Sequence, residues 1–409
     1  MIFTGCRSAW VLFVILCCSF QFHELAGQVL TAEDSLQAGI KRDKSSAIAG
    51  YGEAFYQYDA TQHNANAGLN RNVLFVGYKF NTKFSLFTEL EIENAVVSST
   101  KLKASIGMEQ AFVKMNLNSN HYVVAGLFIP RLGIINENHL STTFNSVFRP
   151  VVETIIIPST WREIGVGYYG QLEQLDNLYI AATVQNGLNS EGFSLNEGIR
   201  DGRQSGYVPG GVNLGHTLSL LYYKNNFRFQ TSHYFGGSTG IQPRVADSLG
   251  LNKGMYANPV LINEADIQYL TKEWQVKLLG AYTSIFNAEN INTVYANNTP
   301  SKLYGAYLEI AYNVLHQHKI KKLWTYIRQE FVNTNFRIPY NGIKDESNNQ
   351  KITFLGLTYK PIHGIALKGE YVYTNTGQRN EGLVVSPFPQ VLPYYTQQHQ
   401  VRFGIAYNF

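Results

Sequence analysis

The sequence predicts an all-β fold, a transmembrane antiparallel β-barrel of about 16 strands. Apolar and polar residues alternate with a period of two through most of the chain, as in strands that face lipid on one side and a lumen on the other. Charged residues make up only 15% of the chain, whereas a typical soluble domain has about 25%. The chain also holds 27 Tyr and 24 Phe, which are residues that gather at membrane interfaces.

Residues 1–27 have the pattern of a secretory signal peptide. Arg7 gives a positive start, residues 10–20 form an apolar core too short to span a bilayer, and residues 25–27 supply small side chains for cleavage. A lipoprotein anchor at Cys17 or Cys18 is the alternative, although Leu16 occupies a position that calls for a small residue. All three cysteines fall in this leader, so the mature chain is expected to have no disulfide.

The rest of the chain divides into a lead-in and a barrel. Residues 28–45 are polar and are predicted to form a short periplasmic lead-in, and residues 46–409 are predicted to form the barrel. No segment beyond the leader has the 18 or more apolar residues of a membrane helix, so any later span must be a strand. We expect strands at residues 46–59, 71–80, 83–94, 105–116, 121–127, 161–170, 177–186, 212–224, 227–235, 261–270, 273–284, 303–313, 323–333, 351–360, 365–375 and 398–409.

The connections between these strands alternate in length. Tight turns are predicted at residues 81–82, 118–120, 225–226, 271–272 and 362–364. Long polar connections are predicted at residues 60–70, 95–104, 128–160, 187–211, 236–260, 285–302, 334–350 and 376–397. Short periplasmic turns that alternate with long external loops are typical of outer-membrane barrels.

The final strand shows how the predicted strands face. Phe403, Ile405 and Phe409 share one face, and Arg402 and Asn408 lie on the other. An apolar row toward lipid and a polar row toward the lumen fit a closed sheet, which pairs every backbone group inside the membrane. The terminal aromatic Phe409 resembles the assembly signal of bacterial outer-membrane proteins. We therefore expect two partners, outer-membrane lipid and the barrel-assembly machinery.

Residues 128–160 form the third external loop and are the candidate pore constriction. About 30 residues without a strand are unusual in a compact domain unless the loop has a function. We interpret the segment as a loop folded into the lumen, where it narrows the pore; the alternative is a loop that lies over the barrel rim.

The third loop and its exit hold charges of both signs. The candidate solute-binding residues are Arg131, Arg149, Glu153, Arg162 and Glu163. Arginines facing carboxylates across a narrow passage produce a field that selects solutes by size and charge, and guanidinium groups match phosphate or carboxylate oxygens. In the alternative interpretation, Arg149 pairs with Glu153 and Arg162 pairs with Glu163, and these pairs brace the loop.

The fourth external loop supplies two further candidates, Arg200 and Arg203. They flank an Asp-Gly turn and could bend over the entrance as a second basic element, or Asp201 could neutralise them in an exposed turn.

Sequence motifs give no support for an enzyme, a cofactor or a metal site. The chain has no Gly-x-Ser-x-Gly, His-Glu-x-x-His, phosphate-binding or dinucleotide-binding motif. His316 and His318 precede a basic stretch, but the predicted phase places them in a periplasmic turn. A catalytic group built from residues that meet across strands, such as Ser232 and His233, stays open. A net charge of +4 is too small to indicate nucleic-acid binding.

Several segments resemble porins of Bacteroidetes-type bacteria, which are similar to the phosphate-selective porin O and P superfamily. The resemblance rests on residues 149–153 (RPVVE), 157–167 (IPSTWREIGVG), 186–188 (NGL) and 198–203 (GIRDGR). It implies a 16-stranded porin whose third loop enters the lumen, often assembled as a trimer, with a channel lined by arginines and lysines in the phosphate members. In this chain the predicted lumen rows carry both signs of charge, on Glu89, Glu91, Glu93, Glu330, Arg328, Lys368 and Arg402.

These observations together predict a passive diffusion channel for small hydrophilic solutes or ions. We expect it in the outer membrane of a Gram-negative bacterium, as a homotrimer, with a weak preference for anions such as phosphate if it is selective. The alternative from another class is an occluded barrel that acts as an adhesin, an enzyme or a secretion-complex component. A soluble secreted β-protein would share the alternation of the strands.

Overall fold

The computed structural model describes residues 45–93, 105–172, 175–206, 213–238, 250, 252–383 and 393–409. The predicted signal peptide and residues 28–44 of the predicted lead-in lie outside the described residues, so both stay predictions. No helix in the described part of the chain is long and apolar enough to cross a membrane.

Sixteen antiparallel strands close into one barrel, as predicted, and each strand pairs with its neighbours in the sequence. Strands β1 and β16 pair with each other and close the ring, with Tyr51 opposite Asn408. The strands are β1 Ser46–Asp59, β2 Asn64–Lys79, β3 Phe84–Glu93, β4 Ser105–Asn116, β5 His121–Phe128, β6 Glu163–Gln171, β7 Leu178–Asn186, β8 Leu214–Lys224, β9 Phe227–Gly236, β10 Val260–Leu270, β11 Trp274–Ile285, β12 Lys302–Asn313, β13 Lys322–Arg337, β14 Asn349–Ile362, β15 Ile365–Thr376 and β16 Gln397–Asn408.

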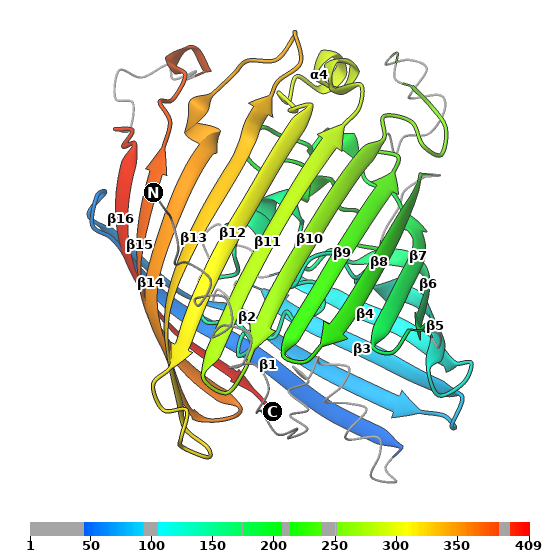
Figure 1. Cartoon of the computed structure of the whole chain (residues 1–409). Helices are drawn as coiled ribbons and strands as arrows, with labels where there is room; N and C mark the ends of the chain where they lie inside the picture. Colours follow the sequence, from blue (N-terminus) through cyan, green and yellow to red (C-terminus); the bar gives the residue numbers. More distant parts are fainter. Residues whose placement is uncertain are drawn as a thin grey trace, which may run out of the picture.

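Short helical segments lie in the connections. Helix α4 spans Ala288–Tyr295 and lies at one end of the barrel in Figure 1. Single-turn segments are η1 Val152–Ile156, η2 Ser190–Gly192, η3 Arg200–Gly202, η4 Glu346–Asn348 and η5 Glu381–Leu383.

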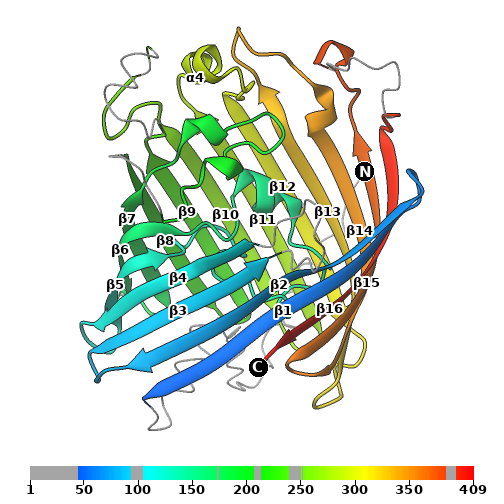
Figure 2. The same cartoon turned by 180° about the vertical axis from the view of Figure 1, so that it is seen from behind.

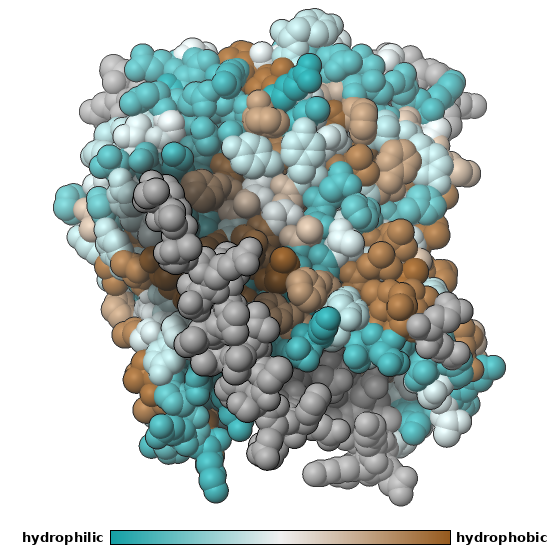
Figure 3. Space-filling model, in the orientation of Figure 1, coloured by the Kyte–Doolittle hydropathy of each residue, from teal (hydrophilic) through white to brown (hydrophobic). Residues whose placement is uncertain are grey.

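Side chains alternate between the two faces of the barrel wall, as the sequence predicts. On β14 the outward-facing Leu355 and Leu357 are about half exposed. Phe354, the inward-facing neighbour of Leu355 on the same strand, is 2% exposed. On β13 the inward-facing Arg328 and Glu330 are buried inside the barrel. Figure 3 shows hydrophobic side chains gathered on the outer face below hydrophilic residues that cover one end of the molecule. This outer belt matches the surface that a transmembrane barrel presents to lipid.

The first external connection differs from the prediction. The sequence predicts a long loop at residues 60–70, but β2 begins at Asn64, so a turn of residues 60–63 joins it to β1. Asp59 fixes this turn, because its Oδ1 accepts hydrogen bonds from the backbone N–H groups of Thr61 and Gln62, both at 2.9 Å. Residues 64–70 (NANAGLN) do alternate, but the apolar phase holds only Ala65, Ala67 and Leu69, and three Asn and one Gly make the segment look like a loop.

Two β-bulges interrupt the wall on one side of the lumen. On β2, Arg71 lies opposite Glu53 and Leu69 opposite Ala54, so Asn70 is the extra residue. On β4, Gln110 lies opposite Glu89 and Met108 opposite Leu90, so Glu109 is the extra residue. A bulge re-aims side chains, and both of these lie beside buried carboxylates.

The connection between β5 and β6, residues 129–162, which we call loop L3, folds into the lumen as predicted (Figure 2). It contacts the wall at several strands: Gln230 on β9 donates to the Gly133 carbonyl at 3.0 Å, and Asn145 donates to Glu309 on β12 at 3.0 Å. It also reaches the closing strands, because the Thr142 hydroxyl donates to Asn408 on β16 at 2.7 Å. The predicted alternative of a loop over the rim is therefore wrong.

Candidate functional site

One half of L3 is fixed to the wall by apolar packing. Val152, Ile156 and Trp161 are fully buried, and the short π-helix η1 carries the first two. The Trp161 ring lies 4.6 Å from the Tyr234 ring of β9, measured between centroids. The shared core joins L3, the fourth external loop, helix α4 and strands β9 to β13, through Leu132, Ile134, Val152, Ile156, Ile157, Trp161, Leu188, Phe193, Ile199, Tyr234, Val260, Ile262, Leu279, Ala281, Ile285, Ala288, Ile291, Leu303, Tyr307 and Val332. Apolar side chains therefore fill the space between this half of L3 and strands β9 to β13.

Glu153 holds the two limbs of L3 together. Its carboxylate accepts hydrogen bonds from the backbone N–H groups of Ile134 and Ile135, at 2.7 and 2.6 Å, and from the Tyr307 hydroxyl at 2.6 Å. Burial raises the pKa of Glu153 to about 7, although the bonds from Tyr307 and Ile135 oppose the shift. The structure therefore does not pair Glu153 with Arg149, and the alternative in which these two residues form an ion pair is wrong.

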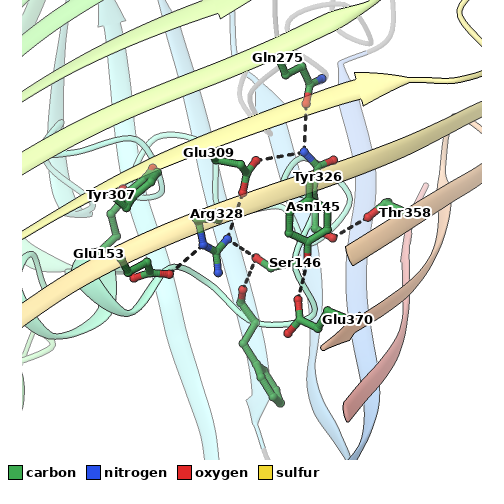
Figure 4. A network of polar contacts seen from close by, with 12 residues as sticks. Asn145, Ser146, Glu153, Gln275, Tyr307, Glu309, Tyr326, Arg328, Thr358 and Glu370 are labelled. Atoms are coloured by element: carbon green, nitrogen blue, oxygen red, sulfur yellow. Dashed lines mark hydrogen bonds and ion pairs between the residues drawn. The ribbon is translucent and has the colours of Figure 1, made fainter. Parts of the chain in front are cut away.

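The tip of L3 is held by an ion network on β12 and β13 (Figure 4). Arg328 lies between two carboxylates: its Nη1 is 3.1 Å from Glu309 Oε2, and its Nε is 2.8 Å from Glu330 Oε1. The same Nη1 donates to the Ser146 hydroxyl at 2.7 Å, and Glu330 accepts the backbone N–H of Val152 at 3.0 Å. The mixed charges predicted for this lumen row thus brace the loop.

Arg131 is also braced, on the β9 and β10 side. Its Nε lies 2.7 Å from Glu137 Oε1, and Glu137 Oε2 lies 2.7 Å from Nη2 of Arg228. Arg228 in turn pairs with Asp266 on β10 at 3.0 Å. Two arginines and two carboxylates balance here, so Arg131 contributes little net field to the lumen.

Arg162 and Glu163 are adjacent but do not pair, so the alternative in which these two residues form an ion pair is also wrong. Arg162 Nη1 lies 3.1 Å from Glu91 Oε2 on β3. Glu163 begins β6 and turns the other way, where it accepts the Trp161 indole N–H at 2.9 Å and the Gln204 N–H at 3.0 Å. Asn186 donates to the same carboxylate. Successive side chains of an extended chain point to opposite sides, which separates the two charges.

Arg149, Arg200 and Arg203 differ from the other arginines in their partners. Arg149 donates to the His139 carbonyl and the Thr160 hydroxyl, both at 3.3 Å. Arg200 donates to the Thr154 carbonyl at 2.7 Å, and Arg203 to the Ser159 carbonyl at 2.9 Å. Within the described ranges, no carboxylate lies at ion-pair distance from these three groups. The fourth loop therefore folds onto L3, and Asp201 does not neutralise its arginines by direct contact.

These arginines are close enough to repel one another. Burial lowers the pKa of Arg203 to about 10, and Arg200 and Arg162 add to the shift. Burial also lowers the pKa of Arg200, where Arg149 adds to the shift. We call Arg149, Arg162, Arg200 and Arg203 the arginine cluster. Its positive charge exceeds what its direct ion pairs neutralise, and all four side chains are half-buried rather than enclosed.

Residues proposed for other chemistry lie apart. Ser232 and His233 are adjacent on β9 and face opposite sides of the barrel wall. Ser232 faces the interior and donates to the Ser219 hydroxyl at 3.1 Å, whereas His233 lies on the outer face beside Asn263. His318 accepts two backbone N–H groups of its own turn, from Ile320 and Lys321.

Glu89, Glu109 and His139 form a buried group that the sequence did not indicate. They come from β3, β4 and L3, so no spacing along the chain connects them. Among the described residues this is the group of carboxylates and histidine that could hold a metal ion.

Comparisons with known proteins match the fold. No family model matches the chain. An uncharacterized protein of Aquifex aeolicus is 28% identical over 342 residues, which cover 80% of this chain and 76% of that protein.

Solved barrels match at lower identity. The outer membrane channel DcaP of Acinetobacter baumannii superposes with a TM-score of 0.55 and 11% identity, covering 89% of this chain and 97% of that one. An anion-selective porin from Comamonas acidovorans has a TM-score of 0.52 and 11% identity, covering 89% and 99%. A trimer form of OmpT of Vibrio cholerae has a TM-score of 0.51 and 11% identity, also covering 89% and 99%.

The chain has the fold of an outer-membrane porin. A closed barrel of sixteen strands with an apolar outer belt and a polar, charged interior belongs in the outer membrane of a Gram-negative bacterium.

Proposed function

We propose that this barrel is a passive diffusion channel for small hydrophilic solutes that prefers anions. The observation that carries the proposal is the arginine cluster, where L3 and the fourth external loop meet. Arg149, Arg200 and Arg203 bond to carbonyl or hydroxyl oxygens and have no directly paired carboxylate among the described residues. Positive charge that is not neutralised beside a narrowed passage concentrates anions there.

The remaining charges of the lumen support the same assignment. Arg131, Arg228 and Arg328 each form an ion pair with a carboxylate, so they act as braces. Guanidinium groups bind phosphate and carboxylate oxygens through two parallel hydrogen bonds, so phosphate is the inorganic anion to test first. The anion-selective porin from Comamonas acidovorans has the same fold, which agrees with the proposal.

Planar-bilayer recording tests the proposal. We would compare the zero-current potential across a KCl gradient for the wild type and for a double variant, Arg149→Gln with Arg200→Gln. Glutamine keeps a donor for the carbonyls. One charge about 6 Å from a permeating ion contributes about 0.7 kcal/mol in water, with opposite sign for an anion and a cation, so each replacement should lower the anion-to-cation permeability ratio by about tenfold.

Lys344→Gln is the control for the loss of one positive charge away from the cluster, because Lys344 is 63% exposed and lies in an external loop. An unchanged ratio in the double variant, or an equal shift in the control, would contradict the role of the arginine cluster. Phosphate block that the double variant loses would assign phosphate as a solute. Silence over many insertions would instead favour an occluded barrel that serves as an adhesin, an enzyme or part of a secretion complex.

Further parts of the proposal concern chemistry and assembly. We propose no enzymatic role, and the separation of Ser232 from His233 across the wall supports this. We also propose a homotrimer, in line with the trimer form of OmpT of Vibrio cholerae. Exposed Phe409 at the end of β16 supports recognition by the barrel-assembly machinery. Light scattering in detergent, corrected for bound detergent, would give the oligomeric state.

A further inference from the structure

A group of two carboxylates and one imidazole lies where L3 meets strands β3 and β4. Glu89 comes from β3, Glu109 from β4 and His139 from L3, and one potential ligand atom from each lies within 4.8 Å of the other two. The three residues are 1%, 0% and 4% exposed. Nothing in the proposed channel function uses them.

The bulge on β4 creates this arrangement. Glu109 is the extra residue of the bulge and belongs to the group, and the following Gln110 donates a hydrogen bond to Glu89 of the same group. Neighbours on a regular strand would face opposite sides. Bulges re-aim side chains and are frequent beside functional sites.

Each of the three side chains is oriented by a neighbour. His139 Nδ1 faces the Asn136 carbonyl at 3.4 Å, which leaves Nε2 directed at the carboxylates. The Tyr51 hydroxyl donates to Glu109 Oε2 at 3.0 Å, and the Gln110 amide donates to Glu89 Oε2 at 2.9 Å. Metal-binding imidazoles and carboxylates are typically held in this way by backbone carbonyls and hydrogen-bond donors outside the site.

The atoms that these neighbours do not hold lack partners. His139 Nε2, Glu89 Oε1 and Glu109 Oε1 are buried and have no hydrogen-bond partner in the described part of the chain. His139 Nε2 lies 3.6 Å from Glu89 Oε2, which is longer than a hydrogen bond. A buried polar atom without a partner costs about 1–3 kcal/mol, and these three converge on one point as an imidazole and two carboxylates, which is a donor set that a cation would satisfy.

The charged side chains around Glu89, Glu109 and His139 are compatible with a bound cation. Besides Glu89 and Glu109, the neighbouring carboxylates are Glu53 and Glu91, and the neighbouring cations are Arg71, Arg149 and Arg162. Glu53 and Glu91 pair with Arg71 and Arg162, whereas no guanidinium group among the described residues lies at ion-pair distance from Glu89 or Glu109. Burial lowers the pKa of His139, but Glu109 and Glu89 outweigh it and raise the pKa above its usual value, so a proton competes for the same place.

We propose that Glu89, Glu109 and His139 bind one divalent transition-metal ion, of which Zn²⁺ is the test case, and that this ion fastens L3 to β3 and β4. The imidazole favours a transition metal over Mg²⁺ or Ca²⁺, and three protein ligands leave a position for water. Zinc ligands lie about 2.0–2.2 Å from the ion, so small side-chain rotations have to draw the three atoms together. The site is independent of whether the barrel conducts anions.

The test uses the full folded chain in detergent, stripped of metal with a chelator and held at about pH 8, where the competing proton is removed more readily. Zn²⁺ is titrated against a chromophoric chelator, with Mg²⁺ in excess. We expect one Zn²⁺ per chain, and at least tenfold weaker binding in His139→Gln and in Glu109→Gln. His233→Gln is the matched control, because His233 lies on the outer face beside Asn263. Wild type that binds no Zn²⁺, or binding that both variants retain, would overturn the proposal.

X-ray absorption at the zinc edge of the loaded wild type keeps the proposal testable even where a variant does not fold. One imidazole with oxygen donors is the expected coordination. Two or more imidazoles, or a shell of water alone, would place the ion elsewhere and overturn the assignment.

Discussion

Glu153→Gln tests how one buried carboxyl group controls the stability of the loop. Burial raises the pKa of Glu153 to about 7 from the ordinary 4.5. The folded protein therefore keeps a proton that the unfolded chain releases at lower pH. For this group the free energy of unfolding is highest below about pH 4.5, falls as the pH rises through 7, and is level above that. The difference between 7 and 4.5 corresponds to about 3 kcal/mol.

Glutamine has nearly the shape of glutamate and stays neutral at every pH. Its amide oxygen can accept the N–H groups of Ile134 and Ile135, and its amide N–H can donate to the Tyr307 hydroxyl. Urea unfolding and refolding in lipid vesicles would be followed at pH 5 and at pH 9. We expect the wild type to lose about 3 kcal/mol more than Glu153→Gln between these values.

Glu273→Gln, in an exposed turn, is the control for removing a carboxylate. Equal pH dependence in wild type and Glu153→Gln would refute the reasoning, because it would mean that the buried carboxyl group has no raised pKa. Loss of the pH dependence of stability in both Glu153→Gln and Glu273→Gln would also refute the reasoning, because the effect would then not be specific to Glu153.

Two further substitutions test how L3 is held. In Gly305→Val, the added Cβ would lie 2.9 Å from Ile156 Cγ1 and 3.0 Å from Val152 Cγ1, so we expect a loss of roughly 1–3 kcal/mol in urea unfolding and an altered single-channel conductance. Gly280→Ala, whose methyl group meets nothing within 4 Å, should behave as wild type, and matching effects at the two glycines would contradict this packing. Arg328→Met leaves Glu309 and Glu330 without their shared cation and should cost about 3–5 kcal/mol. Adding Glu309→Gln and Glu330→Gln should restore most of that loss, and no recovery would show that the ion network is not the cause.

The barrel and the position of L3 follow from the sequence because both depend on patterns along the chain. The alternation of polar and apolar residues reveals a strand wherever one of its faces meets lipid, as on β14 with Leu355 and Leu357. It is missed at residues 64–70 of β2, where the apolar phase holds only Ala65, Ala67 and Leu69, and where three Asn and one Gly suggest a loop. The length of residues 128–160 predicts a loop with a task, and the structure places it in the lumen.

The pairing inside the lumen could be predicted only in part. Arg162 and Glu163 are neighbours in an extended segment, so the two side chains diverge, and this much could have been recognised from geometry alone. Glu153 could not be assigned, because its partners include Tyr307, 154 residues away. The group of Glu89, Glu109 and His139 depends on a bulge, which has no signature in the sequence.

The contacts of L3 with β1 and β16 have a consequence for biogenesis. The Phe148 ring lies 4.9 Å from the Phe55 ring of β1, and Thr142 bonds to Asn408 of β16, so the loop spans the seam from within. Thr142 and Asn408 are 266 residues apart, so this bond can form only when β16 has met β1. The closure of the seam and the docking of L3 against it are therefore coupled, and a barrel with an open seam would lack these two contacts of the loop.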